Sequence, residues 1–162
     1  MLKKKKFILP KEIDVKAGKI TYGQRIELGK IFQNLETSEI EKFNQTFECL
    51  HNFRPVVLQY KKLLPYFEKI IDGLKFWIET EQTLLKYEPS VEELSAGIKE
   101  LSEKLGEFGV VKSIGKVFSC DPDLILKWEY SKVFYILFTD LEEAKFQIRF
   151  QKVLEQKYKT KK

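Results

Sequence analysis

The sequence contains few residues that could act as a nucleophile or bind a transition metal. There is one histidine, His51, and there are two cysteines, Cys49 and Cys120. Three such residues cannot supply the four Cys or His ligands of a zinc site without carboxylates. Cys49 and His51 lie two residues apart in a predicted helix, so their side chains should point to different faces and not form a catalytic dyad. We therefore predict no metal site and two ordinary thiols, as found in a reducing compartment.

Residues 109–117 resemble a phosphate-binding loop only superficially. The motif requires Gly at position 110 and Ser or Thr at position 117, and this chain has Val110 and Val117 there. No side-chain oxygen follows Lys116 to hold a magnesium ion. We interpret the segment as a junction between helices that is interrupted by glycine.

Acidic pairs are common, but most of them stand at predicted helix starts, where a carboxylate offsets the helix dipole. Glu79 and Glu81 are different, because they interrupt the apolar stripe of a long predicted helix and have no such explanation. No combination of nucleophile, base and orienting group emerges. We predict that the protein is not an enzyme and has no catalytic residues, no cofactor and no small-molecule substrate.

The composition favours a helical fold around a real core. The chain has 162 residues, of which 43% are hydrophobic, and it contains only eight Gly and five Pro. A chain of this length corresponds to about one domain, and its Lys and Glu content favours helices. We predict an all-α fold, a single-domain bundle of about six helices with a short N-terminal β arm or hairpin. The predicted divisions are a basic tail (1–6), the β arm (7–21), the helical domain (22–156) and a second basic tail (157–162).

Periodicity and capping signals place the elements. Alternating apolar residues on both sides of Gly18 predict the hairpin, and Pro65 is expected in the first turn of the longest helix. Capping-box spacing predicts helix starts at Ser38, Ser90 and Thr139, and Asp121 precedes a proline at the first helical position. The predicted helices cover about 22–34, 38–52, 64–86, 90–105, 110–118 and 122–134, and a final helix begins near 139.

The positive charge is concentrated at the two ends of the chain. The net charge is +5, and the ends carry eight lysines and no acid, so residues 7–156 carry a net charge of −3. We interpret the ends as solvated tails, with binding to nucleic acid through them as the alternative. The lysines concerned are Lys3, Lys4, Lys5, Lys6, Lys157, Lys159, Lys161 and Lys162.

Aromatic residues are more numerous than a small bundle needs. Most of them should pack in the core, because they fall at helical spacing. The excess could also form a surface for a protein partner. Segment 127–135 presents bulky residues on more than one helix face and is the best candidate. The partner-binding residues that we nominate are Trp128, Tyr130, Phe134 and Tyr135, followed by Gln24 and Arg25.

Three segments resemble small helical proteins encoded among the tail genes of bacteriophages and prophages, particularly those of gut Bacteroidetes. They are Ile20–Leu28 with its GQRIEL sequence, Ser90–Ile98, and Phe118–Phe134 with Asp-Pro before a Trp and Tyr helix. The arrangement is similar to that of tail assembly chaperones. The resemblance implies a protein that binds the apolar helices of a tape-measure-type tail protein and catalyses no reaction.

Three functions follow in order of preference. The first is an assembly chaperone or adaptor that binds a tail protein or another copy of itself, and the second is a structural component of the virion. The third is a nucleic-acid-associated factor that uses the terminal lysines. The apolar run after the first lysines, Phe7–Leu9, is too short for an export segment, and no stretch is long enough to span a membrane. We therefore expect a cytoplasmic protein with no membrane partner.

Overall fold

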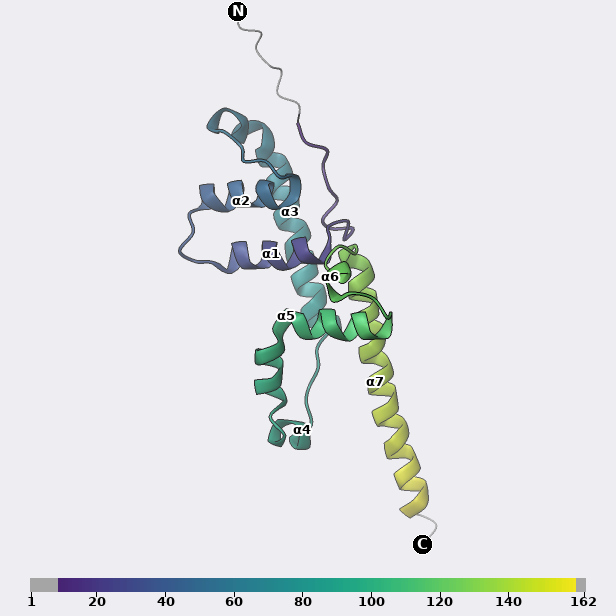
Figure 1. Cartoon of the computed structure of the whole chain (residues 1–162). Helices are drawn as coiled ribbons and strands as arrows, with labels where there is room; N and C mark the ends of the chain where they lie inside the picture. Colours follow the sequence, from purple (N-terminus) through teal and green to yellow (C-terminus); the bar gives the residue numbers. More distant parts are fainter. Residues whose placement is uncertain (1–8, 160–162) are drawn as a thin grey trace, which may run out of the picture.

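The structure is a computed structural model that describes residues 9–159, and within this range the chain forms seven helices and no β-strand (Figure 1). The prediction of an all-α fold is confirmed. The helices are α1 (Tyr22–Gln33), α2 (Glu39–His51), α3 (Val57–Leu84), α4 (Val91–Ser95), α5 (Ile98–Val117), α6 (Pro122–Ile125) and α7 (Tyr130–Lys159).

The predicted N-terminal β arm is wrong over its described residues. Ile13 and Val15 alternate before the turn and Ile20 and Tyr22 after it, but Val15 and Ile20 are buried in the core and do not pair with each other. A turn closes between them, because the Gly18 amide donates to the Val15 carbonyl at 2.9 Å and the Lys19 amide donates to the Asp14 carbonyl at 3.1 Å. The one extended contact that the described residues make is an isolated antiparallel bridge between Thr21 and Glu129.

Three of the predicted helix starts are present with their caps. The Ser38 hydroxyl accepts the Glu41 amide, and Ser90 and Glu93 form a reciprocal capping box. Asp121 caps α6 with Pro122 at its first position. A side-chain oxygen that satisfies a free amide of the first turn explains why these starts can be read from local sequence.

Other helix boundaries differ from the prediction. The helix α3 begins at Val57, seven residues before Leu64, and includes Pro65 in its interior. Pro65 is exposed, so the carbonyl left without an amide donor can face water. The predicted start at Thr139 lies inside α7, where the Thr139 hydroxyl donates to the Tyr135 carbonyl at 2.8 Å. Because α7 already runs through this position, the capping pattern does not begin a new helix here.

The structure divides the predicted helix over 90–105 into two helices, and the predicted break after it is a kink within the second of them. The helix α4 ends at Ser95, and α5 begins after Gly97, which has a left-handed φ of 84°. Gly106 lies inside α5 with φ 47° and ψ −139°, so the two parts of α5 meet at a kink. The kink at Gly106 agrees with the expected break, and Phe108 follows it within the helix.

The core is built largely from aromatic rings in two clusters. In the first, Phe43 and Phe47 of α2 pack on Phe67 of α3, with ring centroids 4.7 and 6.5 Å from that ring. In the second, Trp77 of α3 packs edge-on against Tyr130 and Phe134 of α7, at 4.8 and 5.0 Å. The helix α3 therefore connects the α1–α2 pair to the start of α7 (Figure 1).

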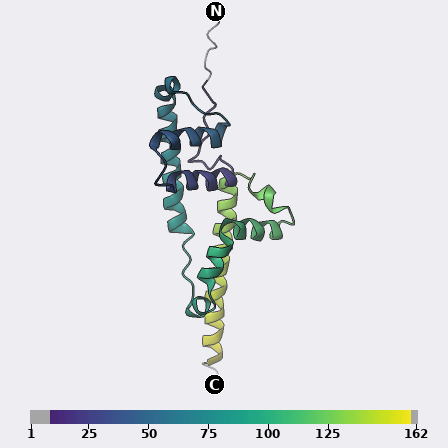
Figure 2. The same ribbon diagram turned by 60° about the vertical axis from the view of Figure 1, so that its left-hand side comes forward.

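Two parts of the chain contribute nothing to this core. We call residues 86–108 the arm and residues 139–159 the free half of α7. No residue of 86–108 and none of 139–158 is buried. Both parts project from the same end of the molecule in the two ribbon views (Figures 1 and 2).

No helix within residues 9–159 is both long enough and apolar enough to cross a lipid bilayer.

Candidate functional site

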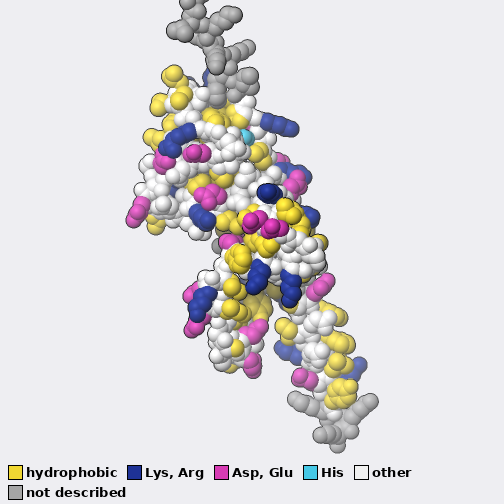
Figure 3. Space-filling view, viewed as in Figure 1, with side chains coloured by type: hydrophobic (Ala, Val, Ile, Leu, Met, Phe, Trp, Pro, Cys, Tyr) yellow, Lys and Arg dark blue, Asp and Glu magenta, His cyan; other side chains and the backbone are white. Residues whose placement is uncertain are grey.

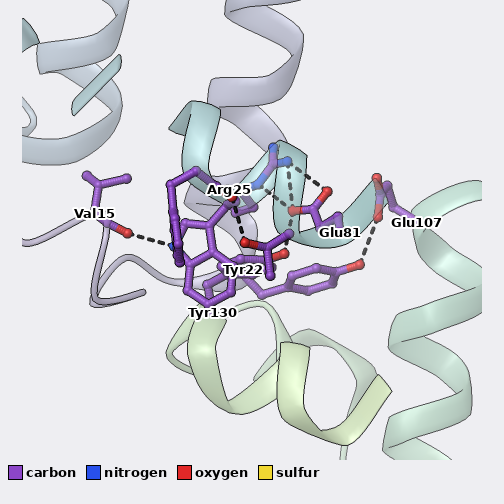
Figure 4. A network of polar contacts seen from close by, with 9 residues as sticks. Val15, Tyr22, Arg25, Glu81, Glu107 and Tyr130 are labelled. Atoms are coloured by element: carbon purple, nitrogen blue, oxygen red, sulfur yellow. Dashed lines mark hydrogen bonds and ion pairs between the residues drawn. The ribbon is translucent and has the colours of Figure 1, made fainter. Parts of the chain in front are cut away.

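The most conspicuous polar feature of the interior is an ion pair between α1 and α3. The Arg25 guanidinium donates to both carboxylate oxygens of Glu81, with Nη2–O distances of 2.8 and 3.0 Å and an Nε–Oε1 distance of 3.1 Å (Figure 4). The side chains of Arg25 and Glu81 are 13% and 29% exposed. A partly shielded bidentate pair of this kind fixes the relative position of two helices. Each charge has lost part of its hydration and is stabilised by the opposite charge instead.

Two tyrosines extend this network to the other helices. The Tyr130 hydroxyl of α7 donates to Glu81, and the Tyr22 hydroxyl of α1 donates to Glu107 of α5 at 2.8 Å (Figure 4). Burial, followed by these carboxylate hydrogen bonds, raises the pKa of both phenols far above the usual value. The hydroxyls therefore stay protonated and act as donors, which joins α7 to α3 and α1 to α5.

A strap formed by residues 13–18 closes over α3. The Trp77 indole donates to the Val15 carbonyl at 2.8 Å, and a Cβ added to Gly73 would lie only 2.8 Å from the Lys16 amide nitrogen. A glycine at position 73 thus permits the backbone of the strap to touch the helix. This close approach sets the position of Trp77, on which the start of α7 packs.

An apolar groove runs between α1 and α3 beside the ion pair. It has a volume of about 480 Å³. Its walls are mainly hydrophobic, and Arg25 and Glu81 lie at its edge. The groove could receive an apolar side chain, and the apolar lining residues are Leu28, Phe32, Ile71, Leu74 and Ile78.

His51 and Cys49 are placed apart and have structural surroundings. The His51 ring shares a hydrogen bond of 2.9 Å with the Tyr66 hydroxyl, which also accepts the Ile13 amide at 2.8 Å. Burial lowers the pKa of His51, and burial also raises the pKa of the Cys49 thiol to about 11. A protonated thiol facing the Gln24 carbonyl at 4.0 Å is a poor nucleophile.

Residues 109–117 form part of α5 and not a phosphate-binding loop. Val111 and Ile114 are buried, and a Cβ on Gly115 would lie 3.0 Å from the Cys120 carbonyl oxygen. Gly115 therefore serves close packing between α5 and the segment leading into α6. Within residues 9–159 no group of three or more His, Cys, Asp or Glu side chains is arranged to hold a metal ion.

The structure separates the four nominated aromatic residues. Tyr130 and Phe134 are each 3% exposed and pack on Trp77, so a partner cannot reach them in this conformation. Trp128 is half-buried beneath Lys132, whose Nζ lies 3.6 Å from its ring centroid. Of the four, only Tyr135 projects into solvent, with 65% of its surface exposed. The four residues lie in one segment of the sequence, but α3 covers one side of that segment.

The two second-ranked residues are engaged inside the chain. Gln24 completes the capping box of α1 with Thr21 and donates to the Cys49 carbonyl at 3.3 Å. Arg25 is held by Glu81. Both residues join helices of this chain, so a partner would have to displace existing contacts to use them.

The terminal lysines fall only partly within the described range. Lys157 and Lys159 lie in the last turns of α7, so the predicted C-terminal tail begins within a helix. The others lie outside the described residues, namely Lys3, Lys4, Lys5, Lys6, Lys161 and Lys162.

The strongest candidate for a binding surface is the arm. Five of its apolar side chains, on α4 and α5, are each at least 41% exposed. The space-filling view shows hydrophobic side chains on both the arm and the free half of α7, with a gap between their tips (Figure 3). We call these exposed apolar residues of the arm the arm stripe: Val91, Leu94, Leu101, Leu105 and Phe108.

Sequence reasoning missed most of the polar network. Its one usable signal was Glu81, an acid inside an apolar stripe without a local partner. An acid at such a position indicates a distant cation, here Arg25, which lies 56 residues earlier. Nothing in the neighbouring sequence marks Glu107 or Tyr22 as a member of this network.

The chain matches no family model, no curated protein and no solved structure.

Proposed function

We propose that this protein is a helix-binding assembly chaperone or adaptor that catalyses no reaction and covers an apolar helix of a partner protein with its arm stripe. The observation that carries the proposal is the exposure of every apolar side chain in that stripe, within a segment, residues 86–108, that contains no buried residue. An amphipathic helix recognises such a surface through residues spaced three and four apart.

The chemistry of the interior agrees with this choice. Burial raises the pKa of Tyr130 and lowers the pKa of His51. Both side chains form hydrogen bonds that join helices of this chain, to Glu81 and Tyr66 respectively. The arm is joined to the packed region at the Gly106 kink, close to the Tyr22–Glu107 hydrogen bond. A projecting arm on a fixed root can lie along a partner helix without disturbing the core.

The partner that we favour is a long apolar helix of the tape-measure type. A helix of this type aggregates unless its apolar stripe is covered, and the resemblance of the sequence to tail assembly chaperones supports this partner. The same surface would serve a structural virion component, which remains in the particle. Mass spectrometry of purified particles distinguishes the two, because a chaperone leaves and a structural component stays.

Binding can be tested with a labelled amphipathic peptide whose leucines repeat every three and four residues. We expect fluorescence anisotropy to show binding to the full chain, and Leu101→Asp and Leu105→Asp to weaken it at least tenfold. Lys99→Gln is the matched control, because it changes the net charge by the same amount on the opposite side of α5. Unchanged affinity in both leucine variants would remove the arm stripe from the proposal.

A further inference from the structure

The free half of α7 carries a second apolar stripe that is independent of the arm. Phe146, Phe150 and Val153 are spaced four and three residues apart and are 46–54% exposed. The rings of Phe146 and Phe150 stack with centroids 6.1 Å apart, so both lie on one face. The same spacing continues to Glu143 at one end and Lys157 at the other. A repeat of this kind is the seam of a two-stranded coiled coil.

We propose that the free half of α7 pairs antiparallel with the same segment of a second copy of this chain, about a two-fold axis at Phe150. In this arrangement Phe150 meets its own copy, and Phe146 packs beside Val153 of the partner subunit. Glu143, seven residues before the axis, meets Lys157 of the partner subunit, which lies seven residues after it. A two-fold interface must be self-complementary, and this stripe satisfies that condition along its whole length.

The charges select the antiparallel direction. The start of the free half has three acids, Asp140, Glu142 and Glu143, against one base, Lys145, and its end has three bases, Lys152, Lys157 and Lys159, against one acid, Glu155. Antiparallel pairing brings acid against base at both ends, whereas parallel pairing brings like charges together. The self-complementary ends identify the occupant as another copy of α7 and disfavour an unrelated helix.

The length of the segment supports the same conclusion. Residues 139–159 would extend about 30 Å as a helix. An isolated helix of this size is marginal in water unless its apolar face is packed. A second copy supplies that packing and covers three side chains that this chain leaves exposed.

One side chain opposes the pairing. Arg149 flanks the axis and would approach its own copy in the dimer. Within the chain, its charge helps to lower the pKa of Glu142, after the hydrogen bond from Lys145. Replacing Arg149 by Gln should therefore strengthen dimerisation about threefold by removing like-charge repulsion.

Sedimentation velocity of the full chain over a range of concentrations tests the proposal. We expect a reversible monomer–dimer equilibrium that Phe150→Asp abolishes. Glu143→Lys should weaken it about tenfold, and adding Lys157→Glu to that variant should restore it. Ile148→Asp and Glu155→Lys are the controls, because both residues lie on other faces of α7. Circular dichroism checks that every variant stays folded.

The outcomes that overturn the proposal are specific. A chain that stays monomeric at several hundred micromolar has no such interface. If Glu143→Lys leaves the association unchanged, the pairing is parallel or uses another face, because in a parallel pair the substitution only exchanges a contact between two acids for a contact between two bases. Leu101→Asp in the arm should not affect dimerisation, and Phe150→Asp should not affect peptide binding, so this inference and the proposed function can fail separately.

Discussion

The two halves of α7 have similar aromatic content and opposite surroundings. In the first half, Tyr130, Val133 and Phe134 are almost fully buried against α3 and the strap. In the second half, Phe146 and Phe150 are about half exposed and stack on each other. The comparison shows that an apolar stripe determines which face of a helix is suited to pack against another element. It does not determine whether the partner is in the same chain.

The same contrast divides the whole molecule. The packed region consists of the strap, α1, α2, α3, the second part of α5, α6 and the first half of α7, and the Arg25–Glu81 network joins α1, α3 and α7 within it. The projecting end consists of the arm and the free half of α7, which have no buried residues through position 158. The packed region fixes the roots of two projecting elements, and the apolar side chains of these elements stay exposed. Four comparisons between variants test this division.

The largest difference should appear between the two halves of α7. Phe134→Ala should lower the free energy of unfolding by about 3–5 kcal/mol, because it opens a cavity beside Trp77. Phe150→Ala should change that of the monomer by less than about 1 kcal/mol, as is usual for exposed sites. Urea unfolding at a concentration below that of self-association measures both. Equal losses in the two variants would mean that the free half of α7 is packed within the monomer.

The next effect concerns the partly buried ion pair between Arg25 and Glu81. Glu81→Gln should lower the free energy of unfolding by about 3 kcal/mol, because it leaves the Arg25 charge shielded from water without its counter-ion. The control is Glu79→Gln, an exposed acid on the same helix, which should be nearly neutral. Replacing both Arg25 and Glu81 by Met should recover most of the loss. A Glu81→Gln protein as stable as the wild type would show that the pair does not hold α1 and α3 together.

A smaller effect is expected at the contact between the strap and α3. Gly73→Ala should destabilise by about 1–3 kcal/mol, since its Cβ would lie 2.9 Å from the Val15 Cβ and force the strap outward. Gly29→Ala is the matched control within a helix, because its nearest neighbour is the flexible Arg25 Nη1 at 3.2 Å. Helix propensity should make the control neutral or stabilising. Thermal unfolding of both variants tests this. The melting temperature should fall for Gly73→Ala and should stay the same or rise for Gly29→Ala.

The smallest effect is a dependence on pH through His51. Burial holds the pKa of His51 below its unfolded value of about 6.5, so the unfolded chain takes up the proton first. Stability associated with this group is therefore present above about pH 6.5 and is lost as the pH falls below it. Comparing urea midpoints between pH 7.5 and 5 should show a steeper decline for the wild type than for His51→Gln. An equal decline would place the titration on other groups.

The sequence allowed the helical fold and several helix starts to be predicted, because caps such as Ser38, Ser90 and Asp121 act on amides within the next turn. It failed for the alternating pairs Ile13/Val15 and Ile20/Tyr22, because a strand and a turn with buried residues on both sides can show the same alternation. It also failed for Thr139, where a hydroxyl can cap a helix or bond within one. What decided these cases was the packing of distant segments, such as Trp77 on Val15.

The candidate site shows the same limit. The nominated segment around Trp128 does contain an exposed aromatic, Tyr135, but Tyr130 and Phe134 face the core. The arm stripe was read from the sequence only as amphipathic helices. Burial is a property of the neighbours that a face meets, so periodicity alone could not separate covered stripes from uncovered ones.

The sequence by itself determined the helical periods, the local caps, the break at Gly106 and the scarcity of groups for chemistry, because each depends on residues within a few positions. Only the tertiary structure decided that Arg25 pairs with Glu81, that the strap lies on Gly73, and that the arm and the free half of α7 remain uncovered. These features depend on distances between residues separated by tens of positions, and such distances are fixed when the helices pack.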